Sequence, residues 1–186
     1  MKLFLATGNA HKVGEIAAIL GPGYDLEARD PGVEETGTTF EANALIKARA
    51  VRDATGALAI ADDSGIVIDG LDGRPGIESA RWTDEGDWIP RVLRELAAAP
   101  DRPRTARFVA AAAACHPDGR EVAVRGEVEG SISSGPRGEA GFGYDPIFVP
   151  DEGDGRTFAE MSAEEKHGLS HRGRAFRALA AELRLA

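Results

Sequence analysis

Hydrophobic and polar positions in the first third of the chain alternate between two patterns. Residues 2–7 form an apolar run that predicts a buried strand. After Gly8, apolar residues recur every three or four positions, so we expect a helix that Asn9 caps and that 21–23 ends. A second helix is predicted over 39–55. Its cap would be Thr39, its buried stripe Phe40, Ala44, Ala48 and Val51, and its end signal Gly56.

The middle of the chain contains two short strand-like runs separated by polar residues. Residues 57–61 and 65–69 are apolar, and between them stand Asp62, Asp63 and Ser64. Neighbouring side chains on a strand point to opposite faces, so both aspartates can face one site only if the backbone turns. We therefore expect a turn at Ser64-Gly65, with residues 70–76 forming a loop.

The second half continues the alternation of strands and helices. Pro90 starts a predicted helix that runs to about Ala99, and 105–132 predicts two strands joined at the turn 117–119. The alanine-rich part of that segment is equally compatible with a helix. Residues 135–150 form a glycine-rich loop. Ser162 and Ser170 are predicted caps of two terminal helices, the second with Phe176, Leu179 and Leu183 as its buried stripe. This order predicts an α/β fold in a single domain, 1–186.

Composition narrows the class of protein. The chain has 186 residues, of which 42% are hydrophobic and 28% charged, with a net charge of −9. An acidic surface disfavours nucleic acid as a partner. The longest apolar run, 108–115, is far shorter than a membrane span, and the N-terminus resembles a first strand more than a signal peptide. Cys115 is the single cysteine, which excludes a disulfide framework and favours a reducing cytoplasm.

The segment 7–12 is the first candidate for binding chemistry. It joins a strand to a helix, so its backbone N–H groups and the positive end of the helix dipole favour an anion such as phosphate. Gly8 permits close approach, and Lys12 adds a positive charge one turn into the helix. The alternative is an ordinary strand–helix turn capped by Asn9.

Asp62 and Asp63 are the second candidate, because ligands of α/β sheets bind at the carboxyl ends of strands. Two neighbouring carboxylates suit Mg²⁺, which binds one or two of them together with waters and phosphate oxygens. The alternative is a solvated turn. Glu34 and Glu35 would either complete the metal shell or complement the dipole of the second helix. Glu41 and Lys47 are assigned to the helix surface or to local ion pairs.

Two further segments suggest a nucleotide. Phe142 and Tyr144 lie among glycines, where aromatic rings either stack on a flat ligand or fill the core. Basic residues gather around the last two helix starts, either to meet an anion or as a solvated face; they are Lys166, His171, Arg172 and Arg174. Together, the phosphate-binding turn, the carboxylate pair, the stacking loop and the basic cluster are the parts of a nucleoside triphosphate site.

Five segments, in this order, closely resemble the inosine triphosphate pyrophosphatase family: "TGNAHKVGEI", "EETGTTFEANALIKA", "ADDSGIVIDGLDGRPGIESARW", "GFGYDPIF" and "FAEMSAEEKHGLSHRGRA". The resemblance covers about 3–180. It implies a long mixed sheet with flanking helices, in two lobes around a deep cleft, and usually a homodimer. It also implies Mg²⁺-dependent hydrolysis of ITP, dITP and XTP to the monophosphate and pyrophosphate, which removes non-standard purines from the nucleotide pool.

The resemblance also implies roles for individual residues. Asp63 would be the proton acceptor, Glu35 and Asp63 would hold the metal, and Asp62 would lie close behind. Phe142 would lie against the base. The residues implied to bind substrate are Thr7, Gly8, Asn9, Ala10, His11, Lys12, Ser64, Phe142, Gly143, Tyr144, Asp145, Lys166, His171 and Arg172. Position 11 varies within the family, so His11 is given no chemistry of its own.

The implied mechanism is in-line attack of water on the α-phosphorus, with pyrophosphate leaving and Asp63 orienting or deprotonating the water. Donors that meet the 6-oxo group of the base, among them Arg172 or backbone N–H groups, would exclude ATP. Two other functions remain open: a pyrophosphatase of broader specificity, and a nucleotide-binding regulator without turnover. A regulator without turnover would be expected to lack a carboxylate at 35, 62 or 63, and all three are present.

Overall fold

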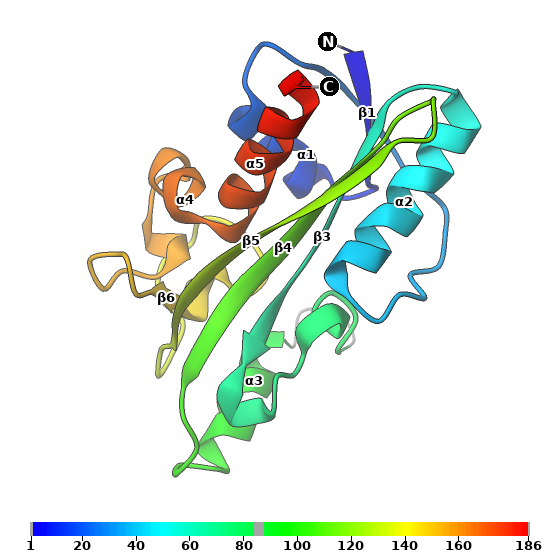
Figure 1. Ribbon diagram of the computed structural model, residues 1–186. Coiled ribbons are helices and arrows are strands. Elements are labelled where there is room, and N and C mark those ends of the chain that lie inside the picture. Colours follow the sequence, from blue (N-terminus) through cyan, green and yellow to red (C-terminus); the bar gives the residue numbers. More distant parts are fainter. Residues whose placement is uncertain (1, 84–87, 186) are drawn as a thin grey trace. The chain divides into compact units, whose positions relative to one another are not determined.

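The computed structural model describes residues 2–83 and 88–185, and its centre is a six-stranded sheet with the order β2-β1-β3-β4-β5-β6 (Figure 1). The strand β1 is parallel to β2 and to β3, whereas β5 and β6 are antiparallel, so the sheet is mixed. The strands are β1 (Lys2–Ala6), β2 (Asp25–Arg29), β3 (Ala59–Ile68), β4 (Thr105–Cys115), β5 (Glu121–Ile132) and β6 (Phe148–Pro150).

Helices follow or precede the strands in the α/β order that the sequence predicts. The α-helices are α1 (Ala10–Leu20), α2 (Phe40–Thr55), α3 (Trp88–Ala97), α4 (Ala163–Leu169) and α5 (His171–Leu185). Short 3₁₀ turns are η1 (Asp69–Leu71), η2 (Gly76–Glu78), η3 (Asp145–Ile147) and η4 (Phe158–Glu160). None of the helices in the described ranges is long and apolar enough to cross a membrane.

The chain folds into two compact units, each with its own hydrophobic core. Among the described residues, the first unit comprises 2–64, 110–126 and 171–185, and the second comprises 65–83, 88–109 and 127–170. The strands β3, β4 and β5 each contribute one part to either unit.

In the first unit, helices cover both faces of the sheet: α1 and α5 on one, α2 on the other (Figure 1). Phe176 and Leu179 of α5 pack with Ile16 of α1 and with alternate alanines of β4. The five alanines 110–114 are fully buried, because this strand is enclosed on both faces. Small side chains therefore line a strand here, which settles the choice between strand and helix for the alanine-rich segment.

Close packing places the start of α5 directly on β5. A Cβ atom at Gly126 would lie 2.2 Å from the carbonyl oxygen of His171 and 2.5 Å from the backbone nitrogen of Ala175. Only glycine leaves room for this contact. The glycine thereby determines where the first residues of α5 lie in the first unit.

Aromatic rings form the centre of the second unit. Phe108, Phe148 and Phe158 contact one another with ring centroids 4.7 to 5.9 Å apart. The rings of Trp88 and Tyr144 lie nearby in the same core, 6.1 Å from each other. This core fixes the loop 141–147 and the helix α4 that follows it.

Most predicted elements are confirmed within one to three residues at each end. Asn9 caps α1 and accepts from the backbone nitrogens of His11 and Lys12, and Thr39 caps α2. Ser162 caps α4 in a capping box, and α5 begins after Ser170. The strand β2 is missing from the prediction because it is mostly exposed and carries little apolar pattern.

The predicted turn at Ser64-Gly65 is wrong. The chain from Ala59 to Ile68 is one continuous strand, β3. Asp62, Asp63 and Ser64 interrupt its apolar pattern, yet the backbone stays extended there. These polar residues can lie within a strand because they have partners inside the fold. The alternation of side chains therefore continues through Asp62 and Asp63.

Candidate active site

Asp62 and Asp63 are both buried in β3 of the first unit, yet they contact different partners. Asp62 pairs with residues of α1 and α5, and Asp63 pairs with residues of α2. Because β3 does not turn, the two carboxylates belong to the two opposite faces of the sheet. The expectation that both face one site through a local turn is therefore incorrect.

Two cations neutralise Asp62. The Nζ of Lys12 lies 2.6 Å from its Oδ2, and the Nε of Arg172 lies 3.4 Å from its Oδ1. Ser64 donates its hydroxyl to the same carboxylate at 3.2 Å. Burial alone would raise the pKa of Asp62, but the charges of Arg172 and Lys12 outweigh burial and hold that pKa far below its usual range. Asp62 is therefore a permanent anion that anchors two basic side chains.

Arg172 is 2% exposed and is bound on all sides. Its Nη2 donates to Ser64 Oγ at 2.8 Å and to Asp62 Oδ2 at 3.4 Å, and its Nη1 donates to Glu15 of α1. The guanidinium joins α5, α1 and β3. The N–H donors of Arg172, which the sequence analysis offered for base recognition, thus bind acceptors inside the protein.

Asp63 lies beside Lys47, which also binds Glu35. Lys47 Nζ is 3.2 Å from Asp63 Oδ1 and 2.6 Å from Glu35 Oε1. Asn43 donates from Nδ2 to Asp63 Oδ2 at 3.3 Å. Burial, together with the charges of Glu35 and Asp62, raises the pKa of Asp63 to about 6 although Lys47 opposes the shift. The charges of Asp63 and Glu35 in turn outweigh burial and raise the pKa of Lys47.

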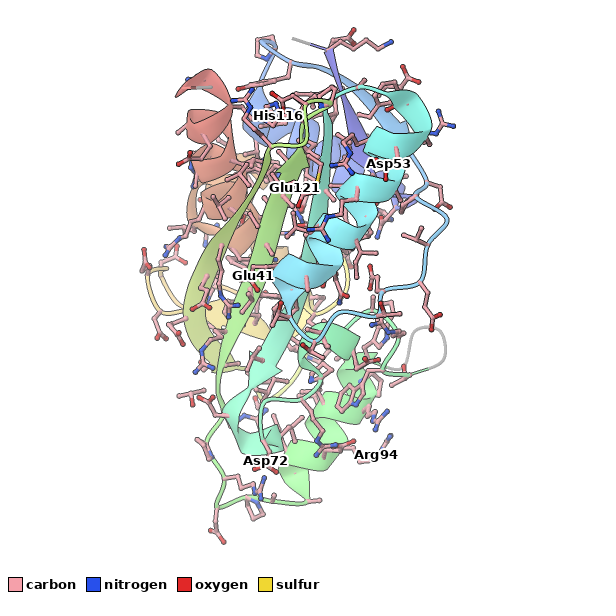
Figure 2. The ribbon with its side chains drawn as sticks, turned by 45° about the vertical axis from the view of Figure 1, so that its right-hand side comes forward. Glu41, Asp53, Asp72, Arg94, His116 and Glu121 are labelled. Carbon is pink, nitrogen blue, oxygen red and sulfur yellow. The ribbon has the colours of Figure 1, made fainter. Side chains whose placement is uncertain are left out.

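Lys47 therefore forms the ion pairs that the sequence allowed but does not lie on the helix surface, since it is only 7% exposed. Glu41, near the start of the same helix, does form a surface pair with Arg125 at 3.1 Å (Figure 2). The difference follows from helical spacing. Lys47 is on the inner stripe of α2 with Ala44, Ala48 and Val51, whereas Glu41 is not.

The donor set of Glu35 and Asp63 fits a divalent cation. One oxygen of each lies within 3.2 Å of the same ammonium nitrogen, so the two carboxylates converge. Carboxylate oxygens are the ligands that Mg²⁺ prefers. Within 2–83 and 88–185 there is no group of three His, Cys, Asp or Glu side chains that could hold a metal by itself. The site thus suits a cation whose remaining ligands are water and phosphate.

The segment 7–12 lies at the N-terminus of α1. Asn9 N donates to Thr7 Oγ1 at 3.1 Å, and the Asn9 side chain accepts from His11 N at 2.9 Å. A Cβ at Gly8 would come within 3.1 Å of Asp30 Oδ2. The residues from Gly8 to His11 are exposed, with Ala10 as the first residue of the helix, and Lys12 reaches back to Asp62. The exposed backbone remains compatible with an anion, and the capping role of Asn9 is confirmed.

The second unit contains the other expected site residues. Asp145 Oδ2 accepts from Lys166 Nζ at 2.6 Å and from Phe142 N at 2.8 Å. Lys166 Nζ also lies 5.1 Å from the centroid of the Phe142 ring. Gly141 has φ +74°, and a Cβ there would be 2.1 Å from Asp145 Oδ2, so only glycine permits this loop. A buried ion pair therefore holds an aromatic ring and a lysine side by side.

Three residues that were expected to bind substrate lie in the core or in a turn. Tyr144 is 5% exposed and donates its hydroxyl to Ser79 O at 2.8 Å, and burial raises its pKa. Gly143 has φ +63° and forms the turn beside it. His171, in the first unit, is 3% exposed at the start of α5. The hydroxyl of Tyr144 is therefore engaged inside the core of the second unit.

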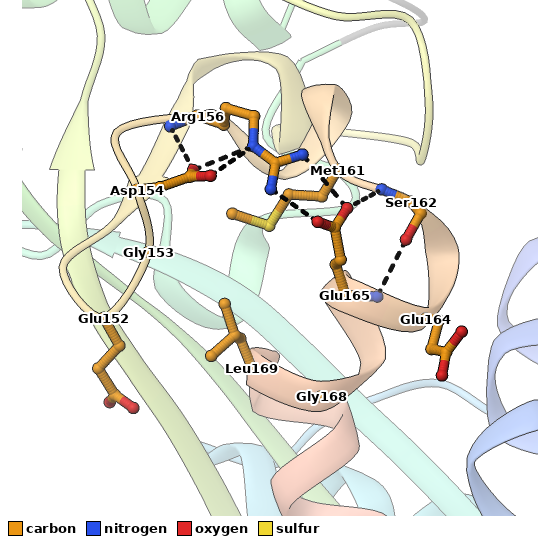
Figure 3. Close-up of a pocket in the computed structure, with 10 residues that line it drawn as sticks. All are labelled: Glu152, Gly153, Asp154, Arg156, Met161, Ser162, Glu164, Glu165, Gly168 and Leu169. Carbon is orange, nitrogen blue, oxygen red and sulfur yellow. Dashed lines mark hydrogen bonds and ion pairs between the residues drawn. The ribbon is translucent and has the colours of Figure 1, made fainter.

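A cavity of about 750 Å³ opens beside α4, and its lining repels anions (Figure 3). Glu152, Asp154, Glu164 and Glu165 line it, with Arg156 as the basic residue. Arg156 is already paired with Asp154 at 2.8 Å and Glu165 at 2.7 Å. The excess of carboxylates makes this cavity unsuitable for a triphosphate.

The sequence analysis missed Asn43 and Glu15, and it gave Lys47 no part in the site. The sequence does contain a signal for Asn43 and Lys47. Asn43 and Lys47 are four residues apart, so they share one face of α2, and that face is the predicted apolar stripe. Polar side chains in a stripe that must be buried require partners, which the carboxylates supply.

The fold and the site together define an α/β protein with a mixed sheet and a buried centre of carboxylates and lysines. The chain belongs to the Ham1 family, whose model matches residues 3–182. This finding confirms the family indicated by the sequence motifs.

Relatives named as dITP/XTP pyrophosphatases are similar over nearly their whole length. A dITP/XTP pyrophosphatase of Symbiobacterium thermophilum is 52% identical, covering 94% of this chain and 90% of that protein. One of Streptomyces coelicolor is 49% identical, covering 96% and 94%. The structure of a HAM1 protein from Coxiella burnetii superposes with a TM-score of 0.88 at 37% identity, covering all of both chains.

Proposed function

We propose that this chain is a nucleoside triphosphate pyrophosphatase that hydrolyses dITP, XTP and ITP to the monophosphate and pyrophosphate. The relatives described as dITP/XTP pyrophosphatases support the reaction. The observation that carries the proposal for this chain is the centre in which Lys47 joins Glu35 and Asp63. Such a centre combines a proton acceptor, a cation and metal-compatible oxygens, as hydrolysis of a phosphoanhydride requires.

Asp63 is the proposed proton acceptor. Its pKa of about 6 keeps it mostly ionised at neutral pH while leaving it a stronger base than an ordinary aspartate. Its Oδ1 is paired with Lys47 and its Oδ2 with Asn43, so the carboxylate has a fixed orientation toward attacking water. Proper alignment of the water is the main contribution, because phosphoryl transfer needs little covalent help from the protein.

Positive side chains are proposed to bind the triphosphate. Lys12 lies at the N-terminus of α1, and Lys47 lies between the carboxylates. Glu35 and Asp63 would hold the proposed Mg²⁺, which when bound supplies additional neutralisation of the phosphate oxygens. The exposed backbone from Gly8 to His11 offers N–H donors to the same charge.

Base selection is proposed to depend on the pair of Phe142 and Lys166. The ring can stack on a purine, and the ammonium can donate to a 6-oxo acceptor, which inosine and xanthine carry. Adenine presents a 6-amino donor there, so ATP would leave polar groups unpaired, a mismatch that can discriminate by about 10⁴. Arg172 is given no base contact, because its donors already bind Asp62, Ser64 and Glu15.

A coupled assay tests this function. Purified protein is mixed with ITP, dITP, XTP, GTP or ATP, with inorganic pyrophosphatase present or absent, and released phosphate is measured with Mg²⁺ and with EDTA. The proposal requires phosphate only when inorganic pyrophosphatase is present, dependence on Mg²⁺, and preference for the three non-standard purines. Rates on ATP or GTP that equal the rates on ITP, dITP and XTP, or phosphate release without the coupling enzyme, would contradict it.

We further propose a cytoplasmic homodimer in which 1–186 acts as a single catalytic domain. The single, buried Cys115 suits a reducing compartment. Light scattering coupled to size exclusion measures the mass of the assembly. A value near the 19.6 kDa of one chain, at working concentration, would contradict the dimer.

A further inference from the structure

Asn43 is a fully buried polar residue that bridges two parts of the candidate active site. Its Oδ1 accepts from Gly37 N at 2.8 Å, and its Nδ2 donates to Asp63 Oδ2 at 3.3 Å. Gly37 is two residues after Glu35, in the segment that precedes α2. A single side chain on α2 therefore contacts both the strand with Asp63 and the segment with Glu35.

The orientation of the amide follows from its partners. A backbone N–H can only donate, so the group that faces Gly37 N must be the carbonyl oxygen. The NH₂ group is then directed at Asp63. Since Lys47 occupies Oδ1 of the same carboxylate, both oxygens of Asp63 have a donor, and rotation of the carboxylate breaks both contacts.

Residue 37 must be a glycine for the contact with Asn43 to form. A Cβ at position 37 would lie 2.6 Å from Asn43 Oδ1 and 2.8 Å from the Cβ of Ala42. Either atom would have to move. The segment with Glu35 can approach α2 this closely only because residue 37 has no side chain.

We propose that Asn43 is a positioning residue that holds Asp63 and the Glu35 segment in register with Lys47 for the hydrolysis reaction. The inference rests on the proposed function and extends the role of Asn43 from its contact with Asp63 to the segment with Glu35. Asn43 acts through its neighbours and need not touch the substrate. Its removal should slow turnover and leave triphosphate binding nearly intact, since Lys12 and the 7–12 segment do not depend on it.

Three substitutions separate the contacts. Asn43→Leu keeps the same branching of the side chain, with a larger volume, and removes both hydrogen bonds. Asn43→Asp keeps an acceptor for Gly37 N but replaces the donor to Asp63 by a second anion. Gly37→Ala disturbs the contact between residue 37 and Asn43 by a change at a partly exposed position. Thr55→Val is the matched control: Thr55 also lies on α2, donates its hydroxyl to Val51 O at 2.7 Å and accepts from Ala57 N at 3.3 Å, and neither partner is a site residue.

Each variant is measured for kcat and KM with ITP, for ITP affinity by calorimetry in EDTA, and for thermal stability. Partners of metal ligands and bases commonly contribute 10- to 100-fold to activity. We expect kcat to fall by about 10- to 100-fold in the three site variants. KM and the affinity in EDTA should stay within about threefold, and Thr55→Val should retain wild-type kcat with a comparable loss of Tm.

The inference is overturned if Asn43→Leu or Asn43→Asp turns over ITP at the wild-type kcat. It is also overturned if Thr55→Val loses as much kcat as they do, or if the loss falls on KM and affinity alone. If Asn43→Leu does not fold, Gly37→Ala decides by the same criteria. Failure of the proposed function would appear in the wild-type chain as absence of hydrolysis, whereas failure of this inference appears only in variants of an active wild type.

Discussion

Replacement of Asp63 by asparagine tests the candidate active site most directly. The side chain keeps its shape and loses its charge and its basicity. In the native chain both carboxylate oxygens accept: Oδ1 from Lys47 and Oδ2 from Asn43. An amide has only one oxygen, so Asp63→Asn must direct an NH₂ group at one of these two donors. Asn43 cannot rotate to compensate, because Gly37 N fixes its carbonyl.

The expected magnitudes follow from these contacts. An unpaired buried polar group costs about 1–3 kcal/mol, and each kcal/mol lowers Tm by about 2–4 °C in a chain of this size. Loss of a general base costs about 10²- to 10⁴-fold in kcat. Affinity for ITP should change little, because Lys12 and the N-terminus of α1 remain. The variant should thus be moderately less stable, competent to bind and nearly inactive.

The assay compares kcat, ITP affinity in EDTA and Tm for Asp63→Asn and for Asp53→Asn. Asp53 is an exposed residue near the C-terminal end of α2 that pairs with Arg52, so its replacement removes the same charge at the helix surface (Figure 2). The control should match the wild type in all three measurements. If Asp63→Asn hydrolyses ITP within about threefold of the wild-type rate, Asp63 is not the proton acceptor and the mechanism is wrong.

Three further predictions concern stability. Lys166→Met breaks the buried pair with Asp145 and should lower the unfolding free energy by about 3 kcal/mol in urea titrations; an unchanged midpoint would contradict a buried pair. Phe176→Ala, in the core of the first unit, should cost about 3–5 kcal/mol in the same titration, and a cost below about 1 kcal/mol would argue against the packing of α5. The hydrogen bond from Arg49 lowers the pKa of Glu121 to about 2 from 4.5, so the pair stabilises the native state fully above pH 4.5. Because the pair is partly exposed, Glu121→Gln should cost about 1 kcal/mol at pH 7 and progressively less as the pH falls from 4.5 toward 2; a cost independent of pH would refute the ion pair.

The sequence predicted the helices and their caps well because these signals are local. Asn9, Thr39 and Ser162 each bond to backbone within a few residues, so neighbouring positions contain all that is needed. The family also followed from contiguous motifs. In contrast, β3 was divided wrongly at Asp62, because polar residues in a strand look like a turn when their partners are unknown.

Those partners come from distant parts of the chain. Arg172 reaches Asp62 across 110 positions, so its place in a buried ion-pair network could not be read from the sequence. The partner that Lys47 and Asn43 share is Asp63, which the sequence could not show because the contact depends on the packing of α2 against β3.

The sequence by itself thus determined the α/β order of elements, the helix boundaries and the chemical types present, since these depend on short-range pattern. Only the tertiary structure decided which charge neutralises which, because burial and Coulomb energy depend on distances in space. For the same reason it alone separated Asp62, held as a fixed anion between Lys12 and Arg172, from Asp63, a carboxyl group of raised pKa beside Lys47.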